Sequence, residues 1–267
     1  MQTLNVQEQA IETTKGAIYT KTWAYPGSSS PIVLIHDSLG STQQWRQFPE
    51  ALALATARTV ISYDRLGYGF SAEYVGVQPS HFMRDEVTMF QHIHRALGLD
   101  EFLLFGHSVG GPIAAMIAAA QPKQCLALMT AGAPAFMEAK IRSGVTAAQA
   151  YFEEAAHLAR LRKYHQEKTD WVLNSWISTW LDRDFDDWCL SDHVAQLACP
   201  ILSLHGDQDE YGSFIQAQRY SELSAFENQA RLLPGCGHVP HVEQPNEAIE
   251  LVKTFIEDHI LASEKIS

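Results

Sequence analysis

Ser108 lies in the segment GHSVG, with a glycine two residues away on either side. The pattern Gly-x-Ser-x-Gly is typical of a nucleophile elbow, a sharp turn from a strand into a helix that strains the backbone of the serine. Glycines are needed there because a β-carbon would collide with the neighbouring strand or helix. The same pattern also fits a tight strand–helix turn without chemistry, so a reactive serine requires partners elsewhere in the chain.

Two later segments supply candidate partners. A serine hydroxyl is a weak nucleophile until a base takes its proton, and that base is usually a histidine oriented by a carboxylate. His238 lies in the glycine-rich segment GCGHVPHVEQP, directly after an apolar run. Asp207 and Asp209 lie in HGDQDEYG, after another apolar run. The residues thus predict a nucleophile, an acid and a base in the chain order Ser, Asp, His, with either aspartate as the acid.

The elements before these residues must bring them together. Short continuous apolar runs predict strands buried on both faces, and segments of helical periodicity such as 82–99 and 109–122 alternate with them. This alternation predicts an α/β protein with a mostly parallel sheet, to which residues 17–25 add an antiparallel edge. Loops at the carboxyl ends of parallel strands converge on one crevice, where Ser108, Asp209 and His238 should meet. The predicted parallel strands are 31–36, 59–64, 102–107, 125–132, 200–206 and 230–235.

The alternation stops after Gly132 and resumes near residue 198. The sequence between contains no segment with a strand pattern, so it most simply forms a helical cap above the edge of the sheet. We therefore expect one core domain made of residues 1–133 and 198–267, with a cap inserted at 134–197.

The expected cap carries four of the six tryptophans. Trp176 and Trp180 are four residues apart and therefore share one face of a helix. This face can pack the cap on the core, line an apolar pocket above Ser108, or do both, since pockets form at such interfaces.

Composition excludes several other functions. The net charge of -12 disfavours a nucleic-acid partner, which needs a basic face. Four scattered cysteines without a Cys-x-x-Cys pair predict free thiols in a reducing cytosol. The first residues lack the pattern of a signal peptide, and no apolar run approaches the roughly 20 residues that span a bilayer. We expect a soluble cytoplasmic protein with a small-molecule substrate.

The same motifs resemble the α/β-hydrolase fold superfamily over nearly the whole chain apart from the cap. The matching segments are GHSVGG, HGDQD, GCGHVPHVEQP, LIHDSLGS and DRLGYGFS. The resemblance implies a mostly parallel central sheet flanked by helices, an inserted helical cap, and catalysis by Ser108, Asp209 and His238 without a cofactor. Asp209 is the acid by the family pattern, because it is the fifth residue of the His-Gly-x-x-Asp loop. The histidines lack the spacing of metal ligands, and no metal is expected.

An oxyanion hole needs two backbone N–H groups. The N–H of Val109, at the start of the helix after the nucleophile, is one candidate. The resemblance implies that Ser38 supplies the other, in a loop where family members usually have His-Gly and this chain has Asp37. We expect the Asp37 carboxylate to point away from the hole and bond local amides. His107, like the two tryptophans, is expected to contribute to the substrate pocket.

The segments SLGSTQQW and GHVPHVEQP are similar to those of 3-oxoadipate enol-lactone hydrolases. The expected function is a serine hydrolase that cleaves a small carboxylic ester or lactone through an acyl-enzyme. One alternative is a carbon–carbon bond hydrolase with the same triad, although HDSLGS lacks the glycine-proline-glycine oxyanion loop typical of those enzymes. Another is a small-molecule binding protein of the same fold with slow turnover.

Overall fold

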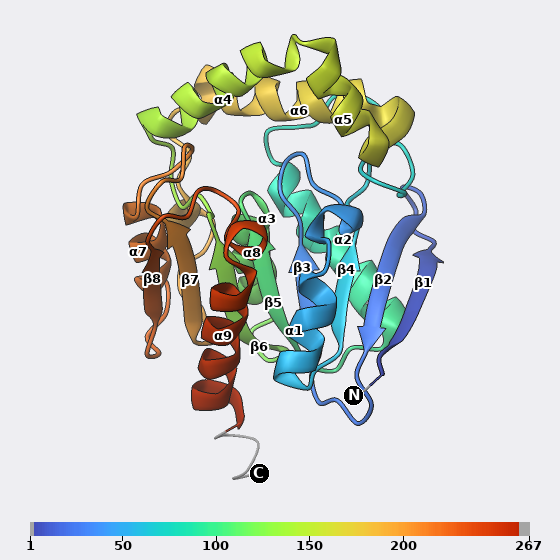
Figure 1. Cartoon of the computed structure of the whole chain (residues 1–267), viewed down its shortest axis with the longest axis vertical. Helices are drawn as coiled ribbons and strands as arrows, with labels where there is room; N and C mark the ends of the chain where they lie inside the picture. The colour runs from blue at the N-terminus through green and yellow to red at the C-terminus, as the bar shows by residue number, and fades with distance from the viewer. Residues whose placement is uncertain (1–2, 262–267) are drawn as a thin grey trace.

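The computed structural model describes residues 3–261, which form one sheet covered by helices on both faces and at one end (Figure 1). The strands are β1 (Asn5–Ile11), β2 (Ile18–Ala24), β3 (Ile32–Ile35), β4 (Val60–Tyr63), β5 (Phe102–His107), β6 (Cys125–Ala131), β7 (Ile201–Gly206) and β8 (Gln229–Leu233). The α-helices are α1 (Phe48–Thr56), α2 (Phe82–Leu97), α3 (Gly110–Ala120), α4 (Ala139–Phe152), α5 (Ala155–His165), α6 (Thr169–Leu181), α7 (Ile215–Ser221), α8 (Pro240–Glu243) and α9 (Pro245–Ile256).

The sheet has the strand order β1-β2-β4-β3-β5-β6-β7-β8. Strands β3 to β8 are parallel, and β2 is antiparallel to both of its neighbours. The α/β class with a mostly parallel sheet, predicted from the sequence, is confirmed. Each of the six predicted parallel strands is present, with its ends shifted by no more than two residues.

The position of β2 corrects one expectation. It is antiparallel, but it is not the edge of the sheet, because β1 pairs along its whole length from Asn5 to Ile11. The first six residues of β1 are exposed, and only Ile11 is buried. A strand that leaves both faces in water carries no apolar pattern, so its sequence, NVQEQAI, gave no signal of a strand.

Apolar layers cover both faces of the sheet. One layer contains the buried side chains of α2 and α3, including Phe90 and Ile113, and the other contains those of α1 and α9, including Leu52 and Phe255. Every residue of β3, β4, β5 and β7 is buried, which explains their continuous apolar sequences. The carboxyl ends of the parallel strands lie together at one edge of this packed sheet.

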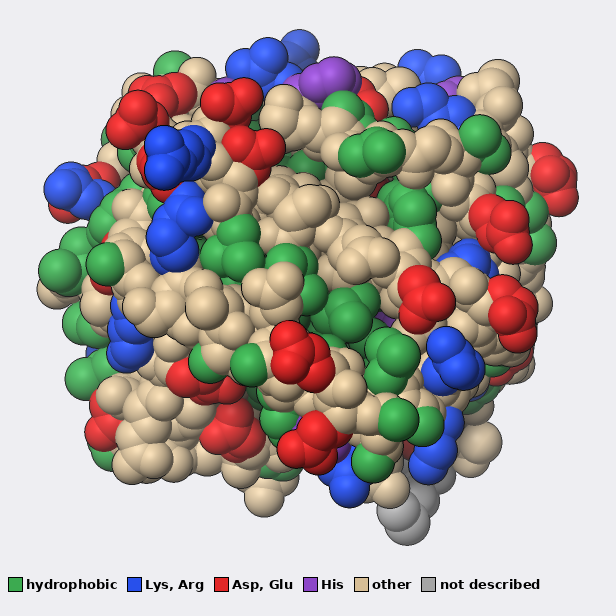
Figure 2. Space-filling model, turned by 90° about the horizontal axis from the view of Figure 1, so that it is seen from above, with side chains coloured by type: hydrophobic (Ala, Val, Ile, Leu, Met, Phe, Trp, Pro, Cys, Tyr) green, Lys and Arg blue, Asp and Glu red, His purple; other side chains and the backbone are tan. Residues whose placement is uncertain are grey.

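Helices α4, α5 and α6 lie above that edge (Figure 1). The two ends of this segment are joined: Met137 N–H donates to the Trp188 carbonyl at 2.9 Å, and Leu190 N–H donates to the Ala135 carbonyl at 2.8 Å. Seen from above, side chains of both charge signs are interspersed over this face (Figure 2). Within residues 3–261, none of the helices has the length and apolar character that crossing a bilayer requires.

Candidate active site

Ser108 lies at the turn between β5 and α3, with a φ of 51°. Its N–H donates to the Ala131 carbonyl at 2.9 Å, and its carbonyl accepts from the Gly111 N–H at 2.8 Å. A β-carbon on Gly106 would overlap the backbone of Gly110, and one on Gly110 would overlap the Ile35 carbonyl. The flanking glycines are therefore required by the close approach of backbone segments, and they allow the strained conformation of the serine.

His238 and Asp209 lie in the loops after β8 and β7 and contact each other. The His238 Nδ1 is 2.9 and 3.0 Å from the two carboxylate oxygens of Asp209. Asp209 is 1% exposed, and its Oδ1 also accepts from the N–H groups of Tyr211 and Gly212, at 2.8 and 3.2 Å. These bonds fix the carboxylate, which in turn holds a proton on Nδ1 and leaves Nε2 as the free basic nitrogen of His238.

The electrostatics of this pair suit a base and its acid partner. Burial alone would lower the pKa of His238, but the hydrogen bond and charge of Asp209, with the charges of Glu210 and Asp37, raise it above its ordinary value. Burial alone would raise the pKa of Asp209, but His238, His205 and the Tyr211 amide lower it below its ordinary value. Asp209 therefore stays ionised at neutral pH, where it stabilises a protonated imidazole.

Asp207, the alternative acid, has a different contact. Its Oδ1 accepts from the Gly235 N–H at 2.8 Å, and the residue is exposed. This bond ties the end of β7 to the turn after β8. Asp207 therefore braces the loop that carries His238 and does not contact the imidazole.

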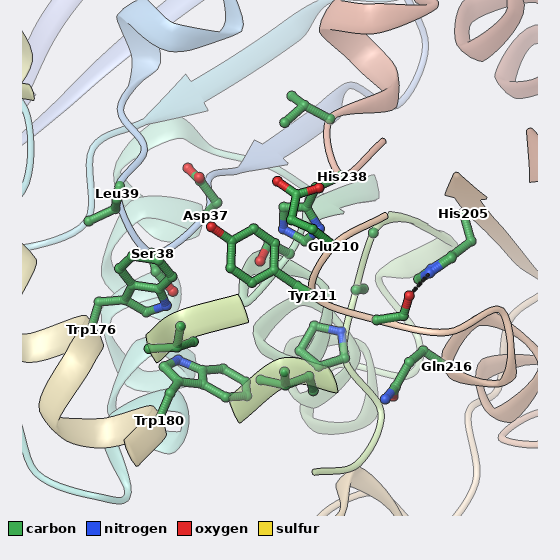
Figure 3. Close-up of a pocket in the computed structure, with 18 residues that line it drawn as sticks. Asp37, Ser38, Leu39, Trp176, Trp180, His205, Glu210, Tyr211, Gln216 and His238 are labelled. Atoms are coloured by element: carbon green, nitrogen blue, oxygen red, sulfur yellow. Dashed lines mark hydrogen bonds between the residues drawn. The ribbon is translucent and has the colours of Figure 1, made fainter. Parts of the chain in front are cut away.

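Ser108 and His238 line one cavity of about 200 Å³ between the sheet edge and the cap (Figure 3). On the cap side its wall is apolar, formed by Trp176 and Trp180 of α6 and by two residues of α4, Ile141 and Val145. On the core side Ser38, Gly132 and Tyr211 complete it. Of the other two cap tryptophans, Trp171 stacks on Tyr74, with ring centroids 5.1 Å apart, and Trp188 stacks on Phe185 at 5.6 Å. Two of the four cap tryptophans thus line the pocket, and the other two pack against aromatic side chains outside it.

A comparison with known protein families agrees with this architecture. The family model described as "Alpha/beta hydrolase family" matches residues 32–250. The chain belongs to the alpha/beta hydrolase family.

Relatives of this hydrolase carry different names. A putative 2-succinyl-6-hydroxy-2,4-cyclohexadiene-1-carboxylate synthase of Bacillus subtilis (strain 168) is 24% identical and aligns over 92% of this chain and 97% of its own length. An sn-1-specific diacylglycerol lipase of Xenopus laevis is also 24% identical, over 87% and 82%. Among solved structures, an esterase from Rhodococcus sp. ECU1013 superimposes with a TM-score of 0.72 at 21% identity, covering 95% of this chain and 99% of that one.

The two expected oxyanion donors of this alpha/beta hydrolase lie at the same cavity. Ser38 lines it directly, and Val109 follows the nucleophile at the N-cap of α3. Within residues 3–261, the backbone N–H groups of Ser38 and Val109 donate to no protein acceptor. Both amides are therefore free to bind an oxygen that develops negative charge beside Ser108.

Asp37 departs from the expectation made for it. Its carboxylate is turned away from Ser38 and Trp176 in Figure 3 and lies against Gly40, where a β-carbon would overlap Oδ1. Within the described chain, however, this carboxylate accepts no hydrogen bond from a local amide, so that part of the expectation was wrong. The loop is held instead through the Asp37 carbonyl, which accepts from Arg65 Nη2 at 2.9 Å and from His36 Nδ1 at 2.8 Å.

The expected place of His107 in the substrate pocket needs correction. Its ring lies behind the catalytic loop, 5.1 Å from the His238 ring and 4.6 Å from that of His241, and its Nε2 donates to the His238 carbonyl at 3.0 Å. Burial lowers the pKa of His107 to about 4, so it is neutral. His107 is the last residue of β5, and it is absent from the lining of the cavity that Ser108 lines. It supports the catalytic loop from behind.

Two residues of the site, Tyr211 and Gly132, were not found by sequence reasoning. The Tyr211 ring lies 4.6 Å from the His238 ring and lines the pocket. Gly132 has a φ of 56°, and a β-carbon there would lie 2.7 Å from the His238 carbonyl oxygen. Glu243 accepts from the N–H groups on both sides of His238, those of Gly237 and Val239, at 2.7 and 2.9 Å. The segment HVEQP predicts this support of His238 by Glu243.

No group of three or more His, Cys, Asp or Glu residues within 3–261 is arranged to hold a metal ion. His36 illustrates the reason, since both of its ring nitrogens are already bonded, Nδ1 to the Asp37 carbonyl and Nε2 to the Arg65 N–H. The four cysteines are free thiols, and three of them are buried.

Proposed function

We propose that this protein is a serine hydrolase that cleaves a carboxylic ester or a lactone of modest size through an acyl-enzyme. The observation that supports it most is the His238–Asp209 hydrogen bond at 2.9 Å beside the cavity that Ser108 also lines. A serine on a strained turn, a buried imidazole–carboxylate pair and two free amides form the set of groups that acyl transfer requires.

In this mechanism His238 Nε2 takes the proton of Ser108 as Oγ attacks the acyl carbon. The N–H groups of Ser38 and Val109 bind the resulting oxyanion, and Asp209 stabilises the imidazolium. The imidazolium then protonates the leaving oxygen, which departs as an alcohol, or stays attached when the substrate is a lactone. A water that His238 deprotonates attacks the acyl carbon, the bond to Oγ breaks, and the proton passes to Oγ.

The pocket favours an acyl group that is apolar and short. Its cap-side wall consists of two tryptophans, an isoleucine and a valine, and its volume of about 200 Å³ leaves no room for a long chain that lies wholly inside. The lipase and esterase named among the relatives act on esters according to their names, which supports the choice of an ester over other acyl substrates.

Fluorophosphonate labelling of the pure protein tests this proposal. We expect one adduct, mapped by mass spectrometry to Ser108, together with turnover of p-nitrophenyl esters and simple lactones. Ser108→Ala should abolish labelling and lower turnover about 10⁴-fold or more, while circular dichroism stays unchanged. A wild-type protein that neither labels nor turns over would contradict the proposal and indicate a binding protein of this fold.

A further inference from the structure

A second cavity lies behind the catalytic loop, and we call it the rear chamber. It has a volume of about 330 Å³, and polar and apolar surface contribute comparably to its lining, which includes Gln44, Trp45, His107 and His241. Asp37 and Val239 line both this chamber and the catalytic pocket, so these two residues form a shared wall. The two cavities are therefore neighbours, with His238 next to the wall that separates them.

Two buried groups in the chamber need a partner. Trp45 is 2% exposed and His241 is 5% exposed, and their ring centroids lie 4.4 Å apart. Within residues 3–261, the Trp45 Nε1 and the His241 Nδ1 have no hydrogen-bond partner in the protein. Buried polar groups of this kind are commonly satisfied by ordered water where a neighbouring cavity is large enough, and a volume of about 330 Å³ has room for several water molecules.

The charges of the lining point to water rather than an ion. Burial keeps the pKa of His107 and of His241 below the ordinary value, so both imidazoles are neutral. Asp37 and Arg46 bring opposite charges to the chamber, and the carboxylate of Glu243 is already bonded to the amides of Gly237 and Val239. The lining thus places two carboxylates and one guanidinium among neutral donors and acceptors, and a lining without a cluster of one charge sign binds water without selecting an ion.

Hydrolysis of the proposed acyl-enzyme requires a water molecule to reach the catalytic pocket. In the proposed acyl-enzyme, the acyl group lies against the apolar wall of Trp176, Trp180 and their neighbours in α4. It thereby excludes water on the cap side at the stage when hydrolysis requires it. The rear chamber offers water on the opposite side, next to the histidine that must activate it.

We propose that the rear chamber delivers the hydrolytic water, across the wall of Asp37 and Val239, to the acyl-enzyme. This inference rests on the proposed function. The water loses its proton to His238 Nε2 and its oxygen bonds to the acyl carbon; the bond from that carbon to Ser108 Oγ breaks, and Oγ takes the proton. The chamber therefore controls deacylation and leaves acylation unaffected.

The test narrows the chamber without touching the catalytic groups. Val242 lines the chamber and is half-buried on α8, so Val242→Trp fills part of the volume, and Val242→Ala is the control that does not. With p-nitrophenyl butyrate, the first turnover of nitrophenol release reports acylation and the steady rate reports deacylation. Added methanol competes with water, and the ratio of methyl butyrate to butyrate reports access of water to the acyl-enzyme.

We expect Val242→Trp to slow deacylation roughly tenfold with acylation unchanged, and to raise the share of methyl butyrate, while Val242→Ala behaves as wild type. His241→Phe, which keeps a ring but removes the unpartnered nitrogen, should act in the same direction. Equal loss of acylation and deacylation, or no change in the methanol ratio, would overturn the inference while the proposed function stands. A wild-type protein that forms no acyl-enzyme at Ser108 would instead overturn the proposed function and the inference with it.

Discussion

On the core side of the pocket each candidate catalytic residue follows a strand of the sheet, whereas on the cap side the wall consists of side chains from two helices, α4 and α6. Ser108 is held by two backbone hydrogen bonds, and Asp209 accepts from two N–H groups as well as from His238. Trp176 and Trp180 are held by apolar and ring contacts, such as that of Trp176 with Tyr211 at 6.0 Å.

Hydrogen bonds fasten the cap to the core at several points. One is Lys168, whose Nζ donates to the carbonyls of Gly69 and Ser71 at 2.7 and 2.6 Å. Another is His165, at the end of α5, which is fully buried: its Nδ1 accepts from the Gly69 N–H at 3.0 Å and its Nε2 donates to the Leu39 carbonyl at 2.8 Å. Hydrogen bonds thus hold the candidate catalytic groups on the core side, whereas apolar and ring contacts hold the two tryptophans of the cap-side wall. A change to the core should abolish the reaction, and a change to the cap should alter which substrate reacts.

The largest expected effect is on the core side. Asp209→Asn should lower kcat about 10⁴-fold, because an amide cannot hold the productive tautomer of His238 or stabilise its charge. Asp207→Asn, two residues away, is the matched control: it should leave kcat and stability nearly unchanged, because the amide oxygen can still accept from the Gly235 N–H and the side chain does not contact His238. Ester hydrolysis and thermal unfolding measure both. A greater loss of kcat in Asp207→Asn would reverse the assignment of the acid.

A smaller effect is expected from the cap wall. Trp180→Ala should change the preference for p-nitrophenyl hexanoate over the acetate by roughly tenfold, measured as a ratio of kcat/KM values, since it removes apolar surface that only the longer chain contacts. Trp171→Ala, which unstacks from Tyr74 outside the pocket, should leave that ratio unaltered. Equal ratios in the two variants would mean that the cap does not select the acyl group.

Changes to His165, which joins the cap to the core, should mainly affect the stability of the protein. His165→Leu leaves the Gly69 N–H and the Leu39 carbonyl without partners and should lower the free energy of unfolding by about 1–3 kcal/mol. His165→Gln, whose amide both accepts and donates, should restore part of that loss. Chemical denaturation measures both variants, and equal stabilities would show that packing alone holds α5 in place.

The smallest expected effect is on the pH profile. His238 must be neutral to take a proton, so kcat/KM should fall as the pH drops through its raised pKa. Asp37→Asn removes one of the charges that raise this pKa, and the acid limb should therefore move to lower pH. Asp170→Asn, a change of the same net charge on the exposed side of the cap, is the control and should not move it. A shift of the acid limb to higher pH would mean that this limb reports the titration of a group other than His238.

The sequence was sufficient wherever a local pattern reflects a local constraint. GHSVG predicted the elbow because close backbone contacts exclude side chains at Gly106 and Gly110. Continuous apolar runs predicted β3 to β7 because nearly every residue of these strands is buried, whereas β8 was predicted although only its Leu233 is buried. β1 was missed for the opposite reason, since a strand that exposes both faces needs no apolar residues.

Side-chain direction and contacts between distant segments could not be predicted in this way. His107 is adjacent to Ser108 in the sequence, yet its ring lies on the other side of the catalytic loop, against His241. His165 bonds to Leu39 from 126 residues away. The choice between Asp207 and Asp209, left open by spacing alone, depends on which carboxylate meets His238, and that contact joins two loops from separate strands.

The sequence by itself therefore determined the fold class, the order of the strands' apolar runs and the types of residue available for chemistry, because these depend on burial and on backbone sterics along a short stretch of chain. Only the tertiary structure decided which nitrogen faces which oxygen, which tryptophans line the pocket and that a second chamber lies behind the loop of His238. Those features depend on the relative placement of segments that lie far apart in the chain, and the free energy that sets it is shared among many weak contacts that no single segment encodes.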